Sequence, residues 1–327
     1  MIQGEMALST ILATVQDELT RVEAKLSQVS EQAYEPLALA LQALLDSGGK
    51  RLRPALTILA SRFGSEIAEE AVFAAAAGVE MLHTATLVHD DLIDDSRTRR
   101  GNPTLNAAWN LGGTVLAGDY IFAQSAAFFA ETRNPRVISL FAETLKTICD
   151  GELRQIFSHL DWTQPEKEYY SRIYSKTASL FAASAESGAV LGGAQEAEVS
   201  ALREYGRCLG MAFQVIDDVL DFTGSEGVMG KPVGSDLRQG ILTLPVFYFM
   251  QQHPGERVRL RSLVEKDATT GVAEAVDMIR QSDAIGAARD QARQFMALAI
   301  AALDSLAAVA PRQTLHELAD FVCTRHL

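Results

Sequence analysis

Residues 66–94 read EIAEEAVFAAAAGVEMLHTATLVHDDLID, an alanine-rich apolar stretch that ends in three aspartates. A second stretch, residues 196–222, reads EAEVSALREYGRCLGMAFQVIDDVLDF and carries the same Asp-Asp-x-x-Asp pattern near its end. Apolar side chains recur every three or four residues in both stretches, which predicts two long helices packed into the protein interior. Unpaired carboxylates are costly in such surroundings, so both acidic patterns need a cationic partner.

The aspartates of each pattern fall at i, i+1 and i+4, within an arc of about 100° on one side of a helix. Hard divalent cations prefer oxygen ligands, and Mg²⁺ is usually held by a few carboxylates together with substrate phosphates. One isolated copy would more often be a helix end with solvated acids, but two copies predict a site for metal-bound phosphate. The expected metal ligands are the first aspartate motif, Asp90, Asp91 and Asp94, and the second aspartate motif, Asp217, Asp218 and Asp221.

Helical periodicity runs through most of the 327 residues, of which 48% are hydrophobic. Only nine prolines occur and no Ser/Gly-rich linker interrupts the chain. We therefore expect one all-α domain over residues 1–327, a bundle of ten or more helices. Its N-terminal helix, within residues 1–30, has apolar residues that could pack on the domain's own core or form a dimer contact. The predicted helical segments are 8–28, 35–46, 66–94, 114–131, 136–158, 166–191, 196–222, 272–284 and 286–309.

Composition excludes several other classes. A net charge of −13 disfavours nucleic acid as a partner, because phosphate backbones require a basic face. Three cysteines in helical patterns argue against a disulfide framework and a zinc site, and we expect them to be small core residues. No stretch reaches the roughly 18 apolar residues of a membrane span, so we expect no transmembrane segment and a cytoplasmic location.

Two basic clusters stand out in this acidic chain: GGKRLRP at residues 48–54 and RTRRG at residues 97–101. Glycine lets a backbone approach a ligand, lysine supplies a point charge, and arginine can bind two oxygens at once. Each cluster alone is more often a charged turn between helices. Beside two aspartate motifs, both indicate phosphate binding, as does Lys231 in a loop between Gly230 and Pro232.

In their order along the chain, these motifs resemble the trans-type isoprenyl diphosphate synthases, in the branch that makes polyprenyl chains. The resemblance covers residues from about 45 to the end. Its blocks are GKRLRP at 49–54, HTATLVHDD at 83–91 with RRG at 99–101, Lys176-Thr177, QVIDDVLD at 214–221 and GKP at 230–232. It implies the isoprenoid synthase fold, with a central active-site cavity, and a homodimer.

The resemblance also implies the reaction: a Mg²⁺-dependent, head-to-tail condensation of isopentenyl diphosphate with an allylic diphosphate. Three Mg²⁺ held by the six aspartates would act as Lewis acids on the allylic diphosphate until its C–O bond breaks. The departed diphosphate would remove the final proton. The implied allylic diphosphate contacts are Arg99, Lys176 and Lys231; those of isopentenyl diphosphate are Lys50, Arg53, His83 and Arg100; Thr177 and Gln214 would face the carbocation.

Product length is expected from the wall of the helix before the first aspartate motif, because bulky aromatics there stop chain growth in this family. The wall residues here are small or non-aromatic: Val79, Leu82, Ala85 and Thr86. All-trans products of seven to ten isoprene units are therefore expected, with a four-unit product as the main competitor. Three aromatics could close the tunnel or be plain core: Phe128, Phe129 and Phe141.

One departure and three alternatives accompany this interpretation. Ile241 stands where many relatives carry a further diphosphate-binding lysine, which puts one phosphate contact in doubt. A class I terpene cyclase would also ionise an allylic diphosphate, but it needs no second diphosphate site such as Lys50 and Arg53. A non-catalytic regulatory subunit would be expected to lack one or both aspartate motifs. The chain could also be the catalytic half of a heterodimer with a small subunit.

Overall fold

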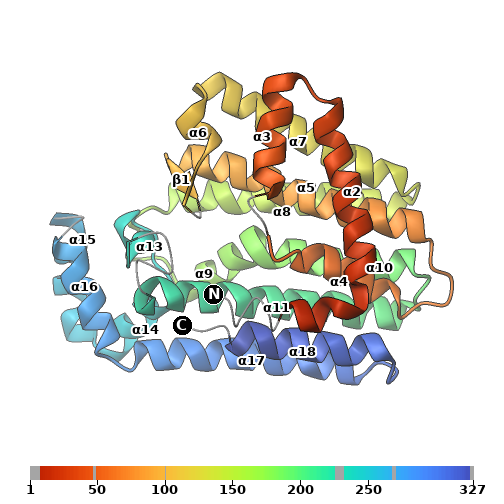
Figure 1. The fold of residues 1–327 in the computed structure, drawn as a ribbon. Helices are drawn as coiled ribbons and strands as arrows, with labels where there is room; N and C mark the ends of the chain where they lie inside the picture. Colours follow the sequence, from red (N-terminus) through yellow and green to blue (C-terminus); the bar gives the residue numbers. More distant parts are fainter. Residues whose placement is uncertain (1–7, 47–48, 100, 225–231, 267–269, 325–327) are drawn as a thin grey trace.

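A computed structural model describes residues 8–46, 49–99, 101–224, 232–266 and 270–324 (Figure 1). Nearly all of these residues are helical, and the two-residue strands β1 and β2 form a small antiparallel hairpin. The predicted all-α fold is confirmed.

The elements follow one another with short connections. In chain order they are η1 (Leu12–Val15), α2 (Gln16–Gln32), α3 (Glu35–Asp46), α4 (Leu52–Ser61), α5 (Glu69–Ile93), β1 (Thr98–Arg99), β2 (Asn102–Pro103), α6 (Leu105–Ala108), α7 (Leu111–Glu131), α8 (Pro135–Phe157), α9 (Glu166–Ile173), η2 (Tyr174–Ala178), α10 (Ser179–Leu191), α11 (Glu196–Thr223), α13 (Ser235–Arg238), α14 (Leu244–Gln252), η3 (Pro254–Glu256), α15 (Arg257–Lys266), α16 (Thr270–Arg280), α17 (Ala284–Asp304) and α18 (Ala310–Thr324).

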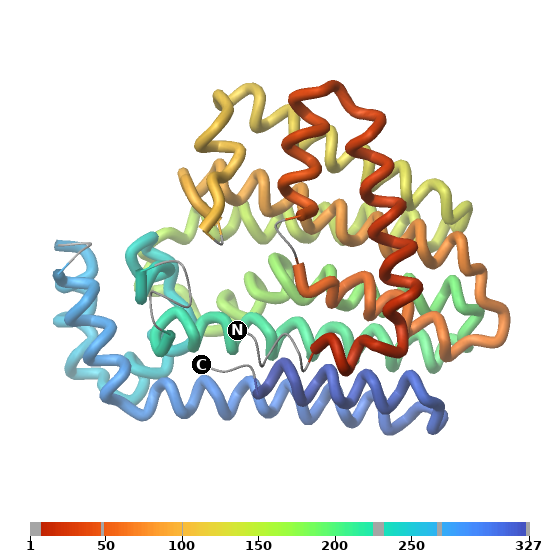
Figure 2. Tube along the Cα trace, in the orientation of Figure 1, coloured from red at the N-terminus to blue at the C-terminus, as the bar shows by residue number. Residues whose placement is uncertain are grey.

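The long helices lie roughly in layers. In Figure 1, α5, α7 and α8 form the upper part of the bundle, and α11 and α17 run side by side along the lower part. Helix α10 packs between α4 and α11. Figure 2 shows the α2–α3 hairpin crossing the bundle, with α14, α15 and α16 gathered at one end. The two aspartate motifs lie on α5 and α11, and both helices end on that same side of the molecule.

Helix α10 is buried along almost its whole length, because glycines allow neighbouring backbones to approach it closely. A Cβ at Gly188 would lie 2.0 Å from the carbonyl oxygen of Thr57 on α4, and one at Gly206 of α11 would lie 2.5 Å from that of Phe181. Small residues at these crossings bring three backbones together. The bundle centre is thus built around α10.

The N-terminal helical segment packs on the chain's own core. Its apolar side chains are buried in the main hydrophobic cluster with residues of α4 and α5. This accounts for the first of the two roles expected of it. The buried members are Leu8, Leu12, Val15, Leu19, Val22 and Leu26.

Helix α5 differs from one expectation. With 25 residues and a mean hydropathy of 1.5 in its best window, it is long and apolar enough to cross a membrane. However, 78% of that window is buried inside the protein, as in the core helix of a globular bundle. Cys149 also differs from the expected packing of the cysteines, because it is exposed on α8 whereas Cys208 is buried.

The close approach of α10 to α4 gives a stability prediction. Gly188→Ala should lower the free energy of unfolding by about 1–3 kcal/mol, because the new methyl overlaps the Thr57 carbonyl and the helices must separate. Gly286→Ala on α17 is the matched control, since a Cβ there meets nothing within 4 Å and gains up to about 1 kcal/mol of helix propensity. Urea unfolding followed by circular dichroism measures both; equal effects would contradict the close packing.

Candidate active site

The first aspartate motif lies at the C-terminal end of α5, and its three carboxylates point in two directions. Asp91 is buried and accepts a bidentate interaction from Arg99, whose Nε lies 2.9 and 3.0 Å from the two carboxylate oxygens. Asp90 instead lies near Lys176, with Nζ 3.6 Å from Oδ2. Asp94, one turn after Asp90, is exposed. Arg99, expected to contact a diphosphate, thus pairs with an aspartate of the first motif.

Lys176 lies between two carboxylates. Besides its contact with Asp90, its Nζ is 2.7 Å from Oε1 of Glu152 on α8. Burial lowers the pKa of Lys176, but the charges of Asp90 and Glu152 outweigh that effect and raise the pKa above its ordinary value. Lys176 therefore stays protonated. Glu152 did not emerge from the sequence, because a single acid on an amphipathic helix carries no motif.

The acidic charge at this end of α5 is only partly compensated. Burial raises the pKa of Asp90 to about 6; Lys176 opposes the shift, and the charges of Glu152 and Asp94 add to it. Partial desolvation by the surrounding protein likewise raises the pKa of Asp94, although its side chain is exposed at the surface. Carboxylates in this state favour a cation, and oxygen donors suit a hard divalent ion. The residues present therefore fit the expected metal.

The second aspartate motif lies near the end of α11, where Asp218 is buried within a hydrogen-bond network. Tyr169 donates from its hydroxyl to Oδ2 at 2.8 Å, and Gln214 donates from Nε2 to Oδ1 at 2.8 Å. Thr177 in turn donates to the Gln214 amide oxygen at 2.6 Å. Burial raises the pKa of Asp218 to about 8, and Asp236 adds to the shift. The network fixes the orientation of the Gln214 amide.

Asp221 and Asp217 have different surroundings. Asp221 is buried and accepts from the backbone N–H groups of Ser235 and Asp236 at 3.2 and 3.1 Å, so it anchors the start of α13. Asp217 is half-buried, and its charge acts on Arg53. In the described part of the chain, no three acidic, histidine or cysteine side chains form a ready-made metal-binding group.

The first basic cluster lies at the N-terminus of α4. Arg51 precedes the helix, and no side chain among the described residues caps its first turn. An uncapped helix start attracts anions. Arg53 lies in that turn with its guanidinium 4.5 Å from the ring centroid of Phe181. Burial lowers the pKa of Arg53 to about 10, against the opposing charges of Glu80 and Asp217.

Lys50 of this basic cluster and His83 of α5 are the other described residues expected to contact isopentenyl diphosphate. Lys50 is exposed, with Nζ 5.2 Å from the ring centroid of Phe321 on α18. His83 is half-buried on α5, which packs against α4. The two other expected contacts, Arg100 and Lys231, lie outside the described residues.

Lys176 and Thr177 both belong to η2, a single π-helical turn between α9 and α10. Such turns insert one residue into an otherwise continuous helix and occur often at functional sites. Ile241, which stands where many relatives were expected to carry a lysine, is half-buried. Its backbone N–H donates to the Asp236 carbonyl at 2.8 Å. His89 packs against α7, with its ring centroid 5.2 Å from that of Phe122.

The residues of the expected chain-length wall all lie on α5, which packs against α7. Val79, Leu82 and Ala85 are buried, whereas Thr86 is half-buried. Farther along α5, a Cβ at Gly78 would lie 2.9 Å from the Phe129 ring.

Phe129 also stacks on Phe141, with ring centroids 4.6 Å apart. Gly78 precedes Asp90 by twelve residues, or about 18 Å along the helix at about 1.5 Å per residue. The aromatic pair therefore packs against α5 more than three helical turns before the aspartates.

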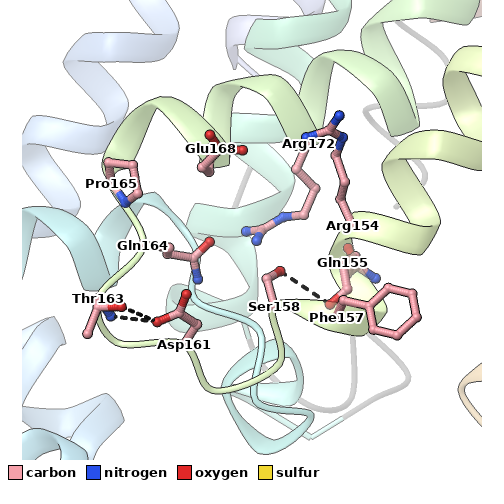
Figure 3. A pocket seen from close by; sticks show the side chains of 10 residues that line it. All are labelled: Arg154, Gln155, Phe157, Ser158, Asp161, Thr163, Gln164, Pro165, Glu168 and Arg172. Atoms are coloured by element: carbon pink, nitrogen blue, oxygen red, sulfur yellow. Dashed lines mark hydrogen bonds between the residues drawn. The ribbon is translucent and has the colours of Figure 1, made fainter.

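A separate cavity of about 360 Å³ lies at the loop between α8 and α9 (Figure 3). The Arg172 guanidinium points into it and donates to the Leu242 carbonyl at 2.5 Å. The same guanidinium lies 5.6 Å from the ring centroid of Tyr169, the donor to Asp218. The cavity thus adjoins the support of the second aspartate motif.

Comparison with known proteins agrees with this geometry. Residues 34–279 match the polyprenyl synthetase family. The chain is 40% identical over 323 residues to heptaprenyl diphosphate synthase component 2 of Geobacillus stearothermophilus, covering 98% of this chain and 99% of that one. Heptaprenyl diphosphate synthase from Staphylococcus aureus has a similar structure, with a TM-score of 0.92, 35% identity and coverage of 95% and 98% of the two chains.

A polyprenyl synthase from Caulobacter crescentus CB15, complexed with calcium and isoprenyl diphosphate, gives a TM-score of 0.90 at 34% identity, with 97% of this chain and 98% of that chain covered. The similarity therefore extends over nearly the whole chain in both sequence and structure. The chain belongs to the polyprenyl synthetase family and is a prenyltransferase.

Proposed function

We propose that this chain is an all-trans polyprenyl diphosphate synthase. It would condense isopentenyl diphosphate head-to-tail with an allylic diphosphate, to a product of seven to ten isoprene units. One observation carries the proposal: the two aspartate motifs, in which burial raises the pKa of Asp90 and of Asp218, lie with Lys176 at one end of the bundle, and the charge of Asp217 acts on Arg53 at the basic start of α4. Such a site suits two diphosphates of which one is bound through metal.

The six aspartates divide into two groups in this proposal. Asp91, Asp218 and Asp221 are more buried than the other three and accept hydrogen bonds from Arg99, Gln214 and the start of α13, so we assign them to holding these groups in place. Asp90, Asp94 and Asp217 would face the metal. Mg²⁺ bound there would offset their charge and withdraw electrons from the allylic diphosphate. The number expected remains three, and the calcium complex of the Caulobacter relative supports a divalent ion.

The chain's own groups prepare the ionisation. Protonated Lys176 is held between Asp90 and Glu152 and can donate to an allylic phosphate oxygen. The Thr177 hydroxyl donates a hydrogen bond to Gln214. The lone pairs of the Thr177 oxygen therefore remain available to stabilise a nearby carbocation. Lys50, Arg53 and His83 would bind the second diphosphate and place its double bond beside that cation. The departing diphosphate would accept the final proton.

A homodimer is proposed through α7. This helix is apolar on nearly every side, with Asp119 and Glu131 as its charged residues, and such helices are normally buried all round. Yet Leu111 and Leu116 are 67% and 69% exposed, and Tyr120 is exposed as well. A second copy of this chain would cover that face through a two-fold contact.

Light scattering of the purified protein measures the assembly. We expect twice the mass of one chain, and Leu116→Glu should shift the mass toward a single chain because it places a charge in the apolar contact. Leu39→Glu, at another leucine that is 69% exposed, is the matched control. A single-chain mass in the unaltered protein would contradict the dimer, and point to the small-subunit alternative suggested by the name "component 2" of the Geobacillus relative.

The metal assignment predicts that Asp90→Ala and Asp217→Ala each lower kcat by about 100-fold or more, because a metal ligand is lost. Neither change should lower the melting temperature by much, since both side chains are only half-buried and alanine is a good helix former. Asp304→Ala, an exposed position at the end of α17, is the control and should retain full activity. Initial rates and thermal unfolding test this; substantial activity in both variants would exclude these aspartates as ligands.

The raised pKa of Asp90 predicts a pH-dependent metal requirement. Below a pKa of about 6 the carboxyl is increasingly protonated and neutral, so a proton competes with the metal. The Mg²⁺ concentration that gives the half-maximal rate should therefore rise about eight-fold between about pH 6.5 and about pH 5. Saturating Mg²⁺ should restore most of the rate. A half-saturation concentration that is constant over this range would contradict the assignment.

Product length is the direct test of the proposed reaction. The purified chain is incubated with Mg²⁺, labelled isopentenyl diphosphate and farnesyl diphosphate, and the products are separated by chromatography. We expect a ladder that ends at seven to ten units. Ala85→Phe should shorten the product because the ring would occupy the space expected for the growing chain. Phe129→Ala should lengthen the product by removing the ring beside Gly78.

A four-unit end product would agree with the proposed condensation. It would contradict the expectation that the small residues of the α5 wall let the chain grow longer. A cyclised hydrocarbon without elongation would indicate the terpene cyclase alternative instead.

A further inference from the structure

Arg51 and Glu80 form an ion pair that the proposed reaction does not use. Arg51 Nη1 donates to Glu80 Oε1 at 2.6 Å, and the side chains are only 15% and 6% exposed. A second arm of the same guanidinium, Nη2, donates to the Leu45 carbonyl at 3.0 Å. The pair therefore ties the chain before α4 to the middle of α5.

The backbone at Arg51 is in a strained conformation. Its φ of 49° and ψ of 30° lie in the left-handed region, which costs a non-glycine residue free energy unless its surroundings hold it there. The side chain supplies that hold through Glu80 and Leu45. A Cβ at Gly49 would lie 3.2 Å from Glu80 Oε1, so the chain also passes close to this carboxylate. Arg51 thus sets the turn between Lys50 and Arg53.

Glu80 is connected to the rest of the basic cluster as well. It precedes His83 by three residues on α5, so the two side chains lie on the same face of the helix. Its charge also acts on the guanidinium of Arg53. One buried carboxylate is therefore linked to Arg53 and His83 directly, and to the chain on both sides of Lys50 through Gly49 and Arg51.

We infer that the Arg51–Glu80 pair is a positioning device for the isopentenyl diphosphate site. Arg51 would not touch the substrate, since its guanidinium is occupied by Glu80 and Leu45. It would hold Lys50 and Arg53 in register with His83, so that three hydrogen-bond donors meet one diphosphate. A buried ion pair adds little net stability compared with apolar residues, which makes a positional role the better account of it. This inference rests on the proposed function.

Four proteins test the inference: the unaltered chain, Arg51→Gln, Glu80→Gln and the double variant. Each single change should raise the KM for isopentenyl diphosphate about ten-fold or more, and change the KM for farnesyl diphosphate less than about two-fold. The double variant should be no worse than the poorer single variant, because the two residues act as a unit. Titration calorimetry with isopentenyl diphosphate alone should show the same loss of affinity without turnover.

The control is Glu18→Gln, which breaks the partly buried ion pair with Arg62 away from the basic cluster. It should leave both KM values unchanged even if it lowers the melting temperature by as much as Glu80→Gln does. Equal changes in both KM values, a loss of kcat alone, or KM effects that multiply in the double variant would each overturn the inference. If the unaltered chain neither binds nor uses isopentenyl diphosphate, the proposed function fails instead.

Discussion

The structure depends on carboxylates buried at the ends of two apolar helices without enough positive charge beside them. Asp90 shows this most clearly, because burial raises its pKa to about 6 although Lys176 is close. The bundle supplies part of the compensation through Arg99, Lys176 and the donors to Asp218. A cation bound there would supply the remainder, so burial that is unfavourable for the carboxylates alone would favour ligand binding.

Support for this arrangement comes from helices that are far apart in sequence. Glu152 on α8 holds Lys176, Tyr169 on α9 holds Asp218, and Glu80 on α5 holds Arg51. Each is buried or nearly so, and each acts on a neighbour that carries a recognisable motif. Metal-site residues in general are oriented by such partners. The site is therefore a shell of motif residues fixed by residues outside the motifs.

The sequence allowed the all-α fold, the family and the location of both aspartate motifs to be predicted, because helical periodicity and motif spacing are local signals. It could not show which of the six aspartates pair with protein groups and which would face a metal. An arc of about 100° is wide enough for Asp90 and Asp91 to have different partners, and their choice depends on β1 and η2. Glu152, Tyr169 and Glu80 were missed because isolated residues acquire their roles only through tertiary contacts.

The π-helical turn η2 has a consequence for the two hydrophobic cores of the molecule. Helices α9 and α10 form one rod through this turn, yet Tyr169 and Ile173 pack in one apolar cluster whereas Phe181 and Ala185 pack in the other. One inserted residue turns the buried stripe by about 100°, so a single rod can serve both cores. Lys176 and Thr177 lie where the stripe changes sides. The site is thus located at a register shift, and the length of this segment is constrained by packing on both sides of it.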